Sequence, residues 1–163
     1  MKLIFLLIPL ILVLLFTTFS FSFKKEVEVE SPANKILESL WQVGENRFQP
    51  LVQEIKMIRE NETYKEYFMT EKLGVPFTSF CFNVTVKLKS TLWRSKMRME
   101  TKIEAQGCSF SHFFQLYPRE RATGVEDSME GNCFLALLPF TKYTASNAHD
   151  KLLHNLKRKM EEK

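Results

Sequence analysis

The sequence has little glycine, proline or cysteine: its 163 residues include five Gly, six Pro and three Cys. Such scarcity of Gly and Pro excludes a collagen-like repeat, and a composition that is 45% hydrophobic and 26% charged excludes a fully disordered chain. An odd number of cysteines implies no closed disulfide framework. The net charge of +4 is too small to indicate a nucleic-acid-binding protein. The length allows one ordinary domain with a short appendage.

Familiar catalytic and metal-binding motifs are also missing from the sequence. It has no Gly-rich phosphate loop, no Gly-x-Ser-x-Gly nucleophile turn and no zinc-protease motif. The three cysteines, Cys81, Cys108 and Cys133, lack the close spacing of zinc ligands. The sequence therefore predicts no cofactor, no metal site and no catalytic residue.

Charge is absent from residues 3–23, an uninterrupted run of 21 uncharged and mostly apolar residues. As a helix this run would be about 30 Å long, enough to cross a bilayer core. Its length exceeds the roughly 7–15 residues of a signal-peptide core. We therefore expect an N-terminal hydrophobic helix that stays on the protein as a membrane anchor. Lys24 and Lys25 follow the run, and positive charge on that side favours a single-pass endomembrane protein with its domain in the cytosol.

The alternative interpretation is a cleaved secretory signal peptide and a secreted or lumenal protein. In this reading residues 3–16 form the apolar core, and small residues at Ser20 and Ser22 suit a cleavage site. Two sequons begin at Asn61 and Asn83, and they would matter only in a lumenal domain. Asn83 falls within a strand pattern, so Asn61 is the better acceptor of the two.

Residues 24–163 form the predicted folded domain. Apolar and polar residues alternate with a period of two in seven segments, which indicates strands that are apolar on one face. Two further segments repeat with helical period. A run of antiparallel strands with helices on one side is an α+β fold. Strands are expected at residues 24–30, 52–59, 63–72, 78–92, 96–104, 108–117 and 123–131, and helices between Pro32 and Gly44 and at residues 144–162.

Four short blocks carry a resemblance to a known family. They are the opening strand and Ser-Pro-Ala helix entry at residues 27–33, the helix at 36–41, the aromatic-x-Pro segment at 48–52 and the closing helix that begins at Leu138-Pro139-Phe140. In this order they resemble the START-like superfamily, also called the Bet v 1-like or polyketide cyclase-like helix-grip fold. The resemblance implies a curved sheet of about seven strands wrapped on a long C-terminal helix. It also implies an apolar tunnel between sheet and helix.

Members of that superfamily mostly carry lipids or other hydrophobic molecules, and a minority catalyse cyclisation or dehydration. The resemblance therefore implies a monomer that binds a hydrophobic small molecule, here beside the membrane held by residues 3–23. Two alternatives remain open: an enzyme of the cyclase or dehydratase type, and an interaction domain with a filled core. The residues expected to line the pocket are Phe82, Val84, Met97, Met99, Phe110, His112, Val125, His149, Leu152 and Leu153. If the protein has no cavity, the same residues fill a solid core.

His112 is the polar residue in this set that most needs a partner. It is in phase with Phe110 and Phe114 on one strand, and Asp127 occupies an inward position on the next, so the two side chains could meet across the sheet. His112 could anchor a ligand headgroup or act as an acid or base, but such a histidine is more often structural.

Overall fold

The computed structural model describes residues 17–42, 51–74, 81–105, 107–135 and 137–162, and these form one seven-stranded antiparallel sheet with two helices. The strand order in the sheet is β1-β7-β6-β5-β4-β3-β2, so every neighbour along the sheet follows in sequence except β1 and β7. The elements are β1 (Thr18–Val29), α2 (Ala33–Trp41), β2 (Val52–Glu60), β3 (Tyr64–Gly74), β4 (Cys81–Trp93), the short 3-10 helix η2 (Arg94–Lys96), β5 (Arg98–Ala105), β6 (Cys108–Pro118), β7 (Thr123–Phe134) and α3 (Leu138–Glu161).

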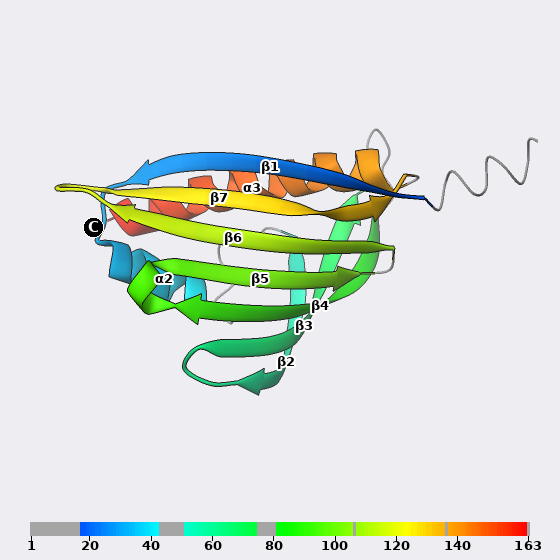
Figure 1. The fold of residues 1–163 in the computed structure, drawn as a ribbon, viewed down its shortest axis with the longest axis horizontal. Coiled ribbons are helices and arrows are strands. Elements are labelled where there is room, and N and C mark those ends of the chain that lie inside the picture. Colours follow the sequence, from blue (N-terminus) through cyan, green and yellow to red (C-terminus); the bar gives the residue numbers. More distant parts are fainter. Residues whose placement is uncertain (1–16, 43–50, 75–80, 106, 136, 163) are drawn as a thin grey trace, which may run out of the picture.

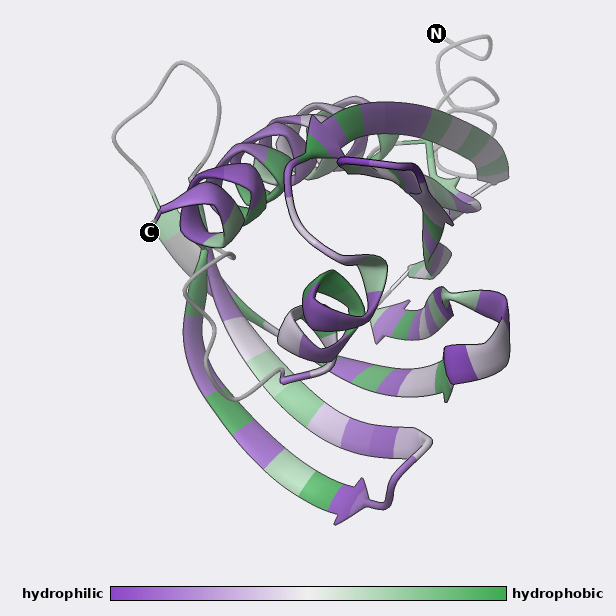
Figure 2. Ribbon diagram, turned by 90° about the vertical axis from the view of Figure 1, so that its left-hand side faces the viewer, coloured by the Kyte–Doolittle hydropathy of each residue, from purple (hydrophilic) through white to green (hydrophobic). Residues whose placement is uncertain are grey.

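The sheet curves around the two helices (Figure 1, Figure 2). Helix α3 packs along β1 and β7, and α2 packs against β5 and β6. The inner face of the sheet and the facing sides of both helices bury one main core, which includes Ile36 of α2, Leu116 of β6 and Leu156 of α3. Burial of these apolar side chains is the main driving force for this arrangement. The predicted α+β helix-grip architecture is confirmed for the sheet and the C-terminal helix.

The N-terminal prediction is wrong for residues 18–23. They belong to β1, which pairs with β7 from Thr18↔Phe134 to Val29↔Thr123, and the expected domain boundary at residue 23 falls inside this strand. The strand forms because Phe21 is buried and packs edge-on against Phe110. Residues 3–16 of the expected anchor lie outside the described residues. No helix in the described part of the chain combines the length and apolarity that crossing a bilayer demands.

The two helices differ from their expected bounds. Helix α3 begins at Leu138, six residues before the start predicted from helical periodicity and at the block that carried the family resemblance. Pro139 occupies its first turn, where the missing N–H costs nothing. Helix α2 ends at Trp41, and the expected stop at Gly44 lies outside the described residues. The earlier start of α3 adds a turn that includes Phe140 and Thr141, two residues that line the cavity described below.

Cys108 and Cys133 form a disulfide, which the odd number of cysteines did not indicate. The two residues are direct partners in the β6–β7 register. The sequence places them 25 residues apart, and only the register of the two strands brings them together. Cys81 is a free, exposed cysteine.

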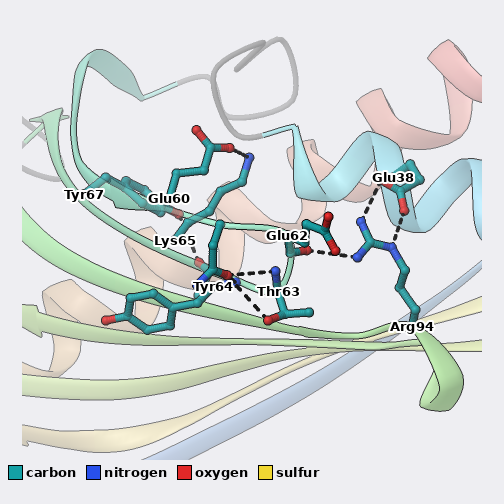
Figure 3. Close-up of polar contacts among 10 residues, drawn as sticks. Glu38, Glu60, Glu62, Thr63, Tyr64, Lys65, Tyr67 and Arg94 are labelled. Atoms are coloured by element: carbon teal, nitrogen blue, oxygen red, sulfur yellow. Dashed lines mark hydrogen bonds and ion pairs between the residues drawn. The ribbon is translucent and has the colours of Figure 1, made fainter.

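Arg94 of η2 connects α2 to the turn between β2 and β3 (Figure 3). Its Nε donates to Oε1 of Glu38 on α2 at 2.9 Å, and its Nη1 donates to the carbonyl oxygen of Glu62 in the β2–β3 turn at 2.9 Å. Next to it the buried Lys65 pairs with Glu60 at 2.6 Å. The Arg94 contacts therefore tie α2 to the β2–β3 turn, while the Lys65–Glu60 pair joins the two strands themselves.

Candidate functional site

A cavity of about 700 Å³ lies between the concave face of the sheet and the helices. Its walls come from residues of β3 to β7, the C-terminal end of α2 and the first half of α3. Most of the wall is aliphatic or aromatic, as in typical pockets for small molecules, which measure about 300–1,000 Å³. Ionisable side chains on this wall include Tyr67, Glu71, His112 and His149.

The predicted wall residues divide into three groups. Six of them border the cavity: Val84, Met99, Phe110, His112, His149 and Leu152. Met97, Val125 and Leu153 pack into the main core instead. Phe82 lies in β4, but its side chain is outside the described part of the structure.

Local backbone geometry explains why Met97 leaves the predicted row. The chain turns through η2 before β5, and Met97 ends this turn with a left-handed φ of 48°. The alternation that would put Met97 and Met99 on one wall therefore begins only at Arg98. Val125 of β7 pairs with Leu116 of β6 in the register, and both side chains belong to the main core.

His112, Asp127 and His149 form a buried cluster at the cavity wall. Asp127 is ionised, so it accepts hydrogen bonds: Nε2 of His112 donates to Oδ1 at 2.7 Å, and Nδ1 of His149 donates to Oδ2 at 2.7 Å. The two rings meet edge to face, with centroids 4.5 Å apart. Both imidazoles border the cavity, while Asp127 is fully buried behind them.

Three elements bring this cluster together. In the β6–β7 register His112 pairs with Met129 and Asp127 pairs with Phe114, so His112 and Asp127 are diagonal neighbours on the inner face. His149 comes from α3, where it is buried together with Leu152 and Leu153. The meeting of His112 and Asp127 across the sheet is confirmed. Sequence analysis placed His149 on the wall but did not predict that it shares the carboxylate, because the rotation of α3 against the sheet is a tertiary feature.

Electrostatics within the cluster keep the carboxyl charged. Burial by itself would raise the pKa of Asp127, but the charge of His112 and the hydrogen bonds from both imidazoles outweigh it and hold the pKa below its usual range. Burial lowers the pKa of His149, and repulsion from His112 and Lys25 acts in the same direction. His149 is therefore biased towards its neutral form.

Glu71 is a cavity residue that sequence analysis missed. It lies on β3, between Met69 and Leu73 on the inward face, and burial raises the pKa of its carboxyl. The signal was present, because Tyr67, Met69, Glu71 and Leu73 alternate along one face, and a carboxylate there interrupts an apolar row. Glu71 thus brings a carboxyl group to the cavity wall itself, on a different strand from the histidine cluster.

Comparison with known proteins identifies the fold. No family model matches the sequence, and no curated protein matches it. Solved structures do match. The Zhui aromatase/cyclase from Streptomyces sp. R1128 superposes with a TM-score of 0.68 and 12% identity, over 86% of this chain and 95% of that one.

Two further structures agree. Norcoclaurine synthase from Thalictrum flavum superposes with a TM-score of 0.64 and 12% identity, over 90% of this chain and 89% of that one. The di-domain aromatase/cyclase StfQ of the steffimycin pathway gives 0.72 and 11%, over 87% of this chain and 51% of that one. The chain has the helix-grip fold of the START-like, or Bet v 1-like, superfamily. At these identities the likeness shows the fold and leaves the activity to be argued from the site.

Proposed function

We propose that this protein binds a hydrophobic small molecule in the cavity between the sheet and α3. The observation that carries the proposal is the cavity of about 700 Å³, whose walls are mostly apolar and carry a few polar groups. Burial of an apolar ligand there supplies binding energy, and the polar groups of the wall fix its orientation. The structurally similar aromatase/cyclases and norcoclaurine synthase support the proposal, since their names describe enzymes that act on small organic molecules.

Substituting Met99 tests whether the cavity is the binding site. Met99 is buried on the cavity wall, and Met99→Trp would fill part of the space. We expect the apolar dye ANS to bind at least about tenfold more weakly to this variant, with a loss of stability of about 1–3 kcal/mol from overpacking. Native mass spectrometry of the wild-type protein should also show a co-purified small molecule that the variant lacks.

The matched control is Met57→Trp, which makes the same change on β2, where the side chain is 38% exposed and does not border the cavity. Dye binding should be unchanged in this variant. If Met99→Trp binds the dye as well as the wild type does, the cavity is not the binding site. A wild-type protein that binds neither dye nor any co-purified molecule would favour an interaction domain instead.

A second candidate function, an enzyme of the cyclase or dehydratase type, is favoured by the two imidazoles at the cavity wall. Such chemistry needs groups that move protons next to an apolar substrate, and His112 and His149 are within reach of a bound molecule. The test compares the small molecules bound to the wild type and to His112→Gln. An enzyme should leave a precursor of different mass in the variant, whereas a carrier should hold the same molecule in both.

For localisation we propose the secreted or lumenal alternative. With residues 18–23 in β1, the apolar residues that precede the strand are 3–16, a run of 14 that suits a signal-peptide core and is short of the roughly 20 needed for a membrane helix. The disulfide between Cys108 and Cys133 supports the same choice, because disulfides persist in oxidising compartments.

The structure also favours one cleavage position for such a signal peptide. Thr18 and Ser20 supply small residues at the two key positions, and the first three residues of β1 are exposed. Cleavage after Ser20 would keep the buried Phe21, whereas cleavage after Ser22 would remove it. N-terminal sequencing of the mature protein should therefore begin at Phe21, and Ser20→Arg should abolish this cleavage. A mature protein that retains residues 1–17 in the membrane fraction would contradict the proposal.

A further inference from the structure

Three metal-binding side chains meet at the cavity wall, each from a different element: His112 from β6, Asp127 from β7 and His149 from α3. They are 7%, 0% and 8% exposed, so the cluster is an interior feature and not a solvated surface group. Both hydrogen-bonding neighbours of the Asp127 carboxylate are imidazoles. A buried carboxylate needs a compensating positive charge, and either a proton on an imidazole or a bound cation can supply it.

We propose that His112, Asp127 and His149 bind a divalent transition metal ion of the zinc type and leave a coordination position open towards the cavity. Two imidazole nitrogens and one carboxylate oxygen make the donor set of a familiar class of three-ligand zinc site, in which water or substrate takes the fourth position. Imidazole ligands favour transition metals over Mg²⁺ and Ca²⁺, which prefer oxygen alone. This site goes beyond the binding of a hydrophobic molecule and does not depend on it.

The spacing of the donor atoms fits a metal after small shifts. A tetrahedral zinc ion with bonds of about 2.0–2.2 Å keeps its ligand atoms roughly 3.4 Å apart. Each imidazole nitrogen now lies 2.7 Å from its carboxylate oxygen, and no two of the three donor atoms are more than 4.8 Å apart. The side chains therefore need to move by roughly 1 Å, which rotation about their own bonds can provide.

The surroundings hold the ligands in place. Phe23 packs against the His149 ring with centroids 5.0 Å apart, and Phe114 packs against the His112 ring at 4.5 Å. The disulfide cross-links β6 and β7, the two strands that supply His112 and Asp127. Metal affinity depends on such support, because ligands that are already oriented lose little freedom on binding.

The open position gives the metal a role towards a bound molecule. Both histidines border the cavity, and Asp127 lies behind them, so the side of the cluster that remains free faces the apolar space. A metal there would bind an oxygen of the ligand, such as a carbonyl, hydroxyl or carboxylate group. The polar end of the hydrophobic molecule would then lie at the histidine cluster.

Cobalt titration tests the site directly. The untagged protein, carrying Cys81→Ser to remove the exposed thiol, is stripped with a chelator and titrated with Co²⁺ and then with Zn²⁺. We expect one equivalent of Co²⁺ to bind with the visible absorption of a four-coordinate site and to be displaced by Zn²⁺. His149→Gln should weaken binding at least 10–100-fold, since even outer-shell changes cost that much. The control is His154→Gln, on the exposed side of α3, which should bind as the wild type does.

Two results would overturn the metal site. One is a folded wild-type protein that takes up no equivalent of Co²⁺ at millimolar concentration, and another is a His149→Gln variant that binds Co²⁺ as tightly. The first result would show that the cluster takes up no metal, and the second would show that Co²⁺ binds elsewhere on the protein. If His149→Gln misfolds, lack of Co²⁺ uptake by the folded wild type still refutes the site, and His112→Gln serves as the second ligand variant. ANS binding measured on the same samples separates the two proposals, because loss of metal uptake with intact dye binding refutes the metal site alone.

Discussion

Reduction of the disulfide between Cys108 and Cys133 should destabilise the protein substantially. The two cysteines are 25 residues apart in sequence. In the chain-entropy description, a cross-link over that distance restricts the unfolded chain by about 3.5 kcal/mol, and typical disulfides contribute about 2–4 kcal/mol. For a domain of this size the loss should lower the melting temperature by roughly 5–14 °C.

Equilibrium unfolding in guanidinium chloride, with and without reductant, measures this loss. Cys108→Ser should reproduce the effect of the reductant and become insensitive to it. The matched control is Cys81→Ser, at the exposed free cysteine, which should change stability little and remain sensitive to reductant. Thiol titration of the unfolded, unreduced protein should find one reactive thiol of the three cysteines present.

The result that would refute this reasoning is specific. Three reactive thiols in the unreduced protein would show that the pair does not form. A single reactive thiol together with equal stability in reductant would show that the cross-link forms but does not restrict the unfolded chain. The first outcome would also remove one of the two supports for a secretory location.

Three further predictions follow from single side chains. Gly131→Ala should lower the free energy of unfolding by about 1–3 kcal/mol through overpacking, because its Cβ would lie 2.2 Å from the carbonyl oxygen of Ser109. Gly124→Ala should lower it little, because its Cβ would meet a flexible arginine side chain at 3.4 Å. Urea unfolding of both variants measures the difference. Burial raises the pKa of Glu71 above its usual value of 4.5, so the folded protein favours the protonated carboxyl. The contribution of Glu71 to the free energy of unfolding is therefore present below pH 4.5 and is lost as the pH rises towards the raised pKa. Glu71→Gln should have the same free energy of unfolding as the wild type at low pH and a larger one above that window. In a secretory host Asn61→Gln should remove one glycan seen as a gel shift, because the residue is in an exposed turn, while substitution of Asn83, in a paired strand, should leave the shift unchanged.

Alternation of apolar and polar residues was sufficient to predict most of the sheet. The predicted strand at residues 108–117 is β6 (Cys108–Pro118), and the one at 123–131 lies within β7 (Thr123–Phe134). These patterns are reliable because each strand has one buried and one wet face, so burial imposes a period of two. The sequence of each strand is therefore enough to predict which face of the sheet each of its side chains occupies.

Residues 18–23 show where local reading fails. They carry no charge, so hydropathy joined them to the preceding apolar run, although Phe19, Phe21 and Phe23 already alternate with Ser20 and Ser22. Only the pairing of β1 with β7 decides between the two interpretations, and that pairing joins residues more than a hundred positions apart. The Cys108–Cys133 disulfide was missed for the same reason, since it follows from strand register and not from spacing.

The two carboxyl groups near the cavity show how register turns similar sequence signals into different chemistry. Asp127 and Glu71 each interrupt an inward apolar row; Asp127 is fully buried, and Glu71 is partly buried. Asp127 lies diagonally opposite one histidine and beneath another, and these partners keep it charged in spite of burial. For Glu71 burial raises the pKa, so its carboxyl stays protonated to a higher pH than an exposed glutamate does. A ligand entering this cavity therefore meets the stronger polar interaction at the histidine cluster, and we expect its polar group to lie there while its apolar part extends past Glu71.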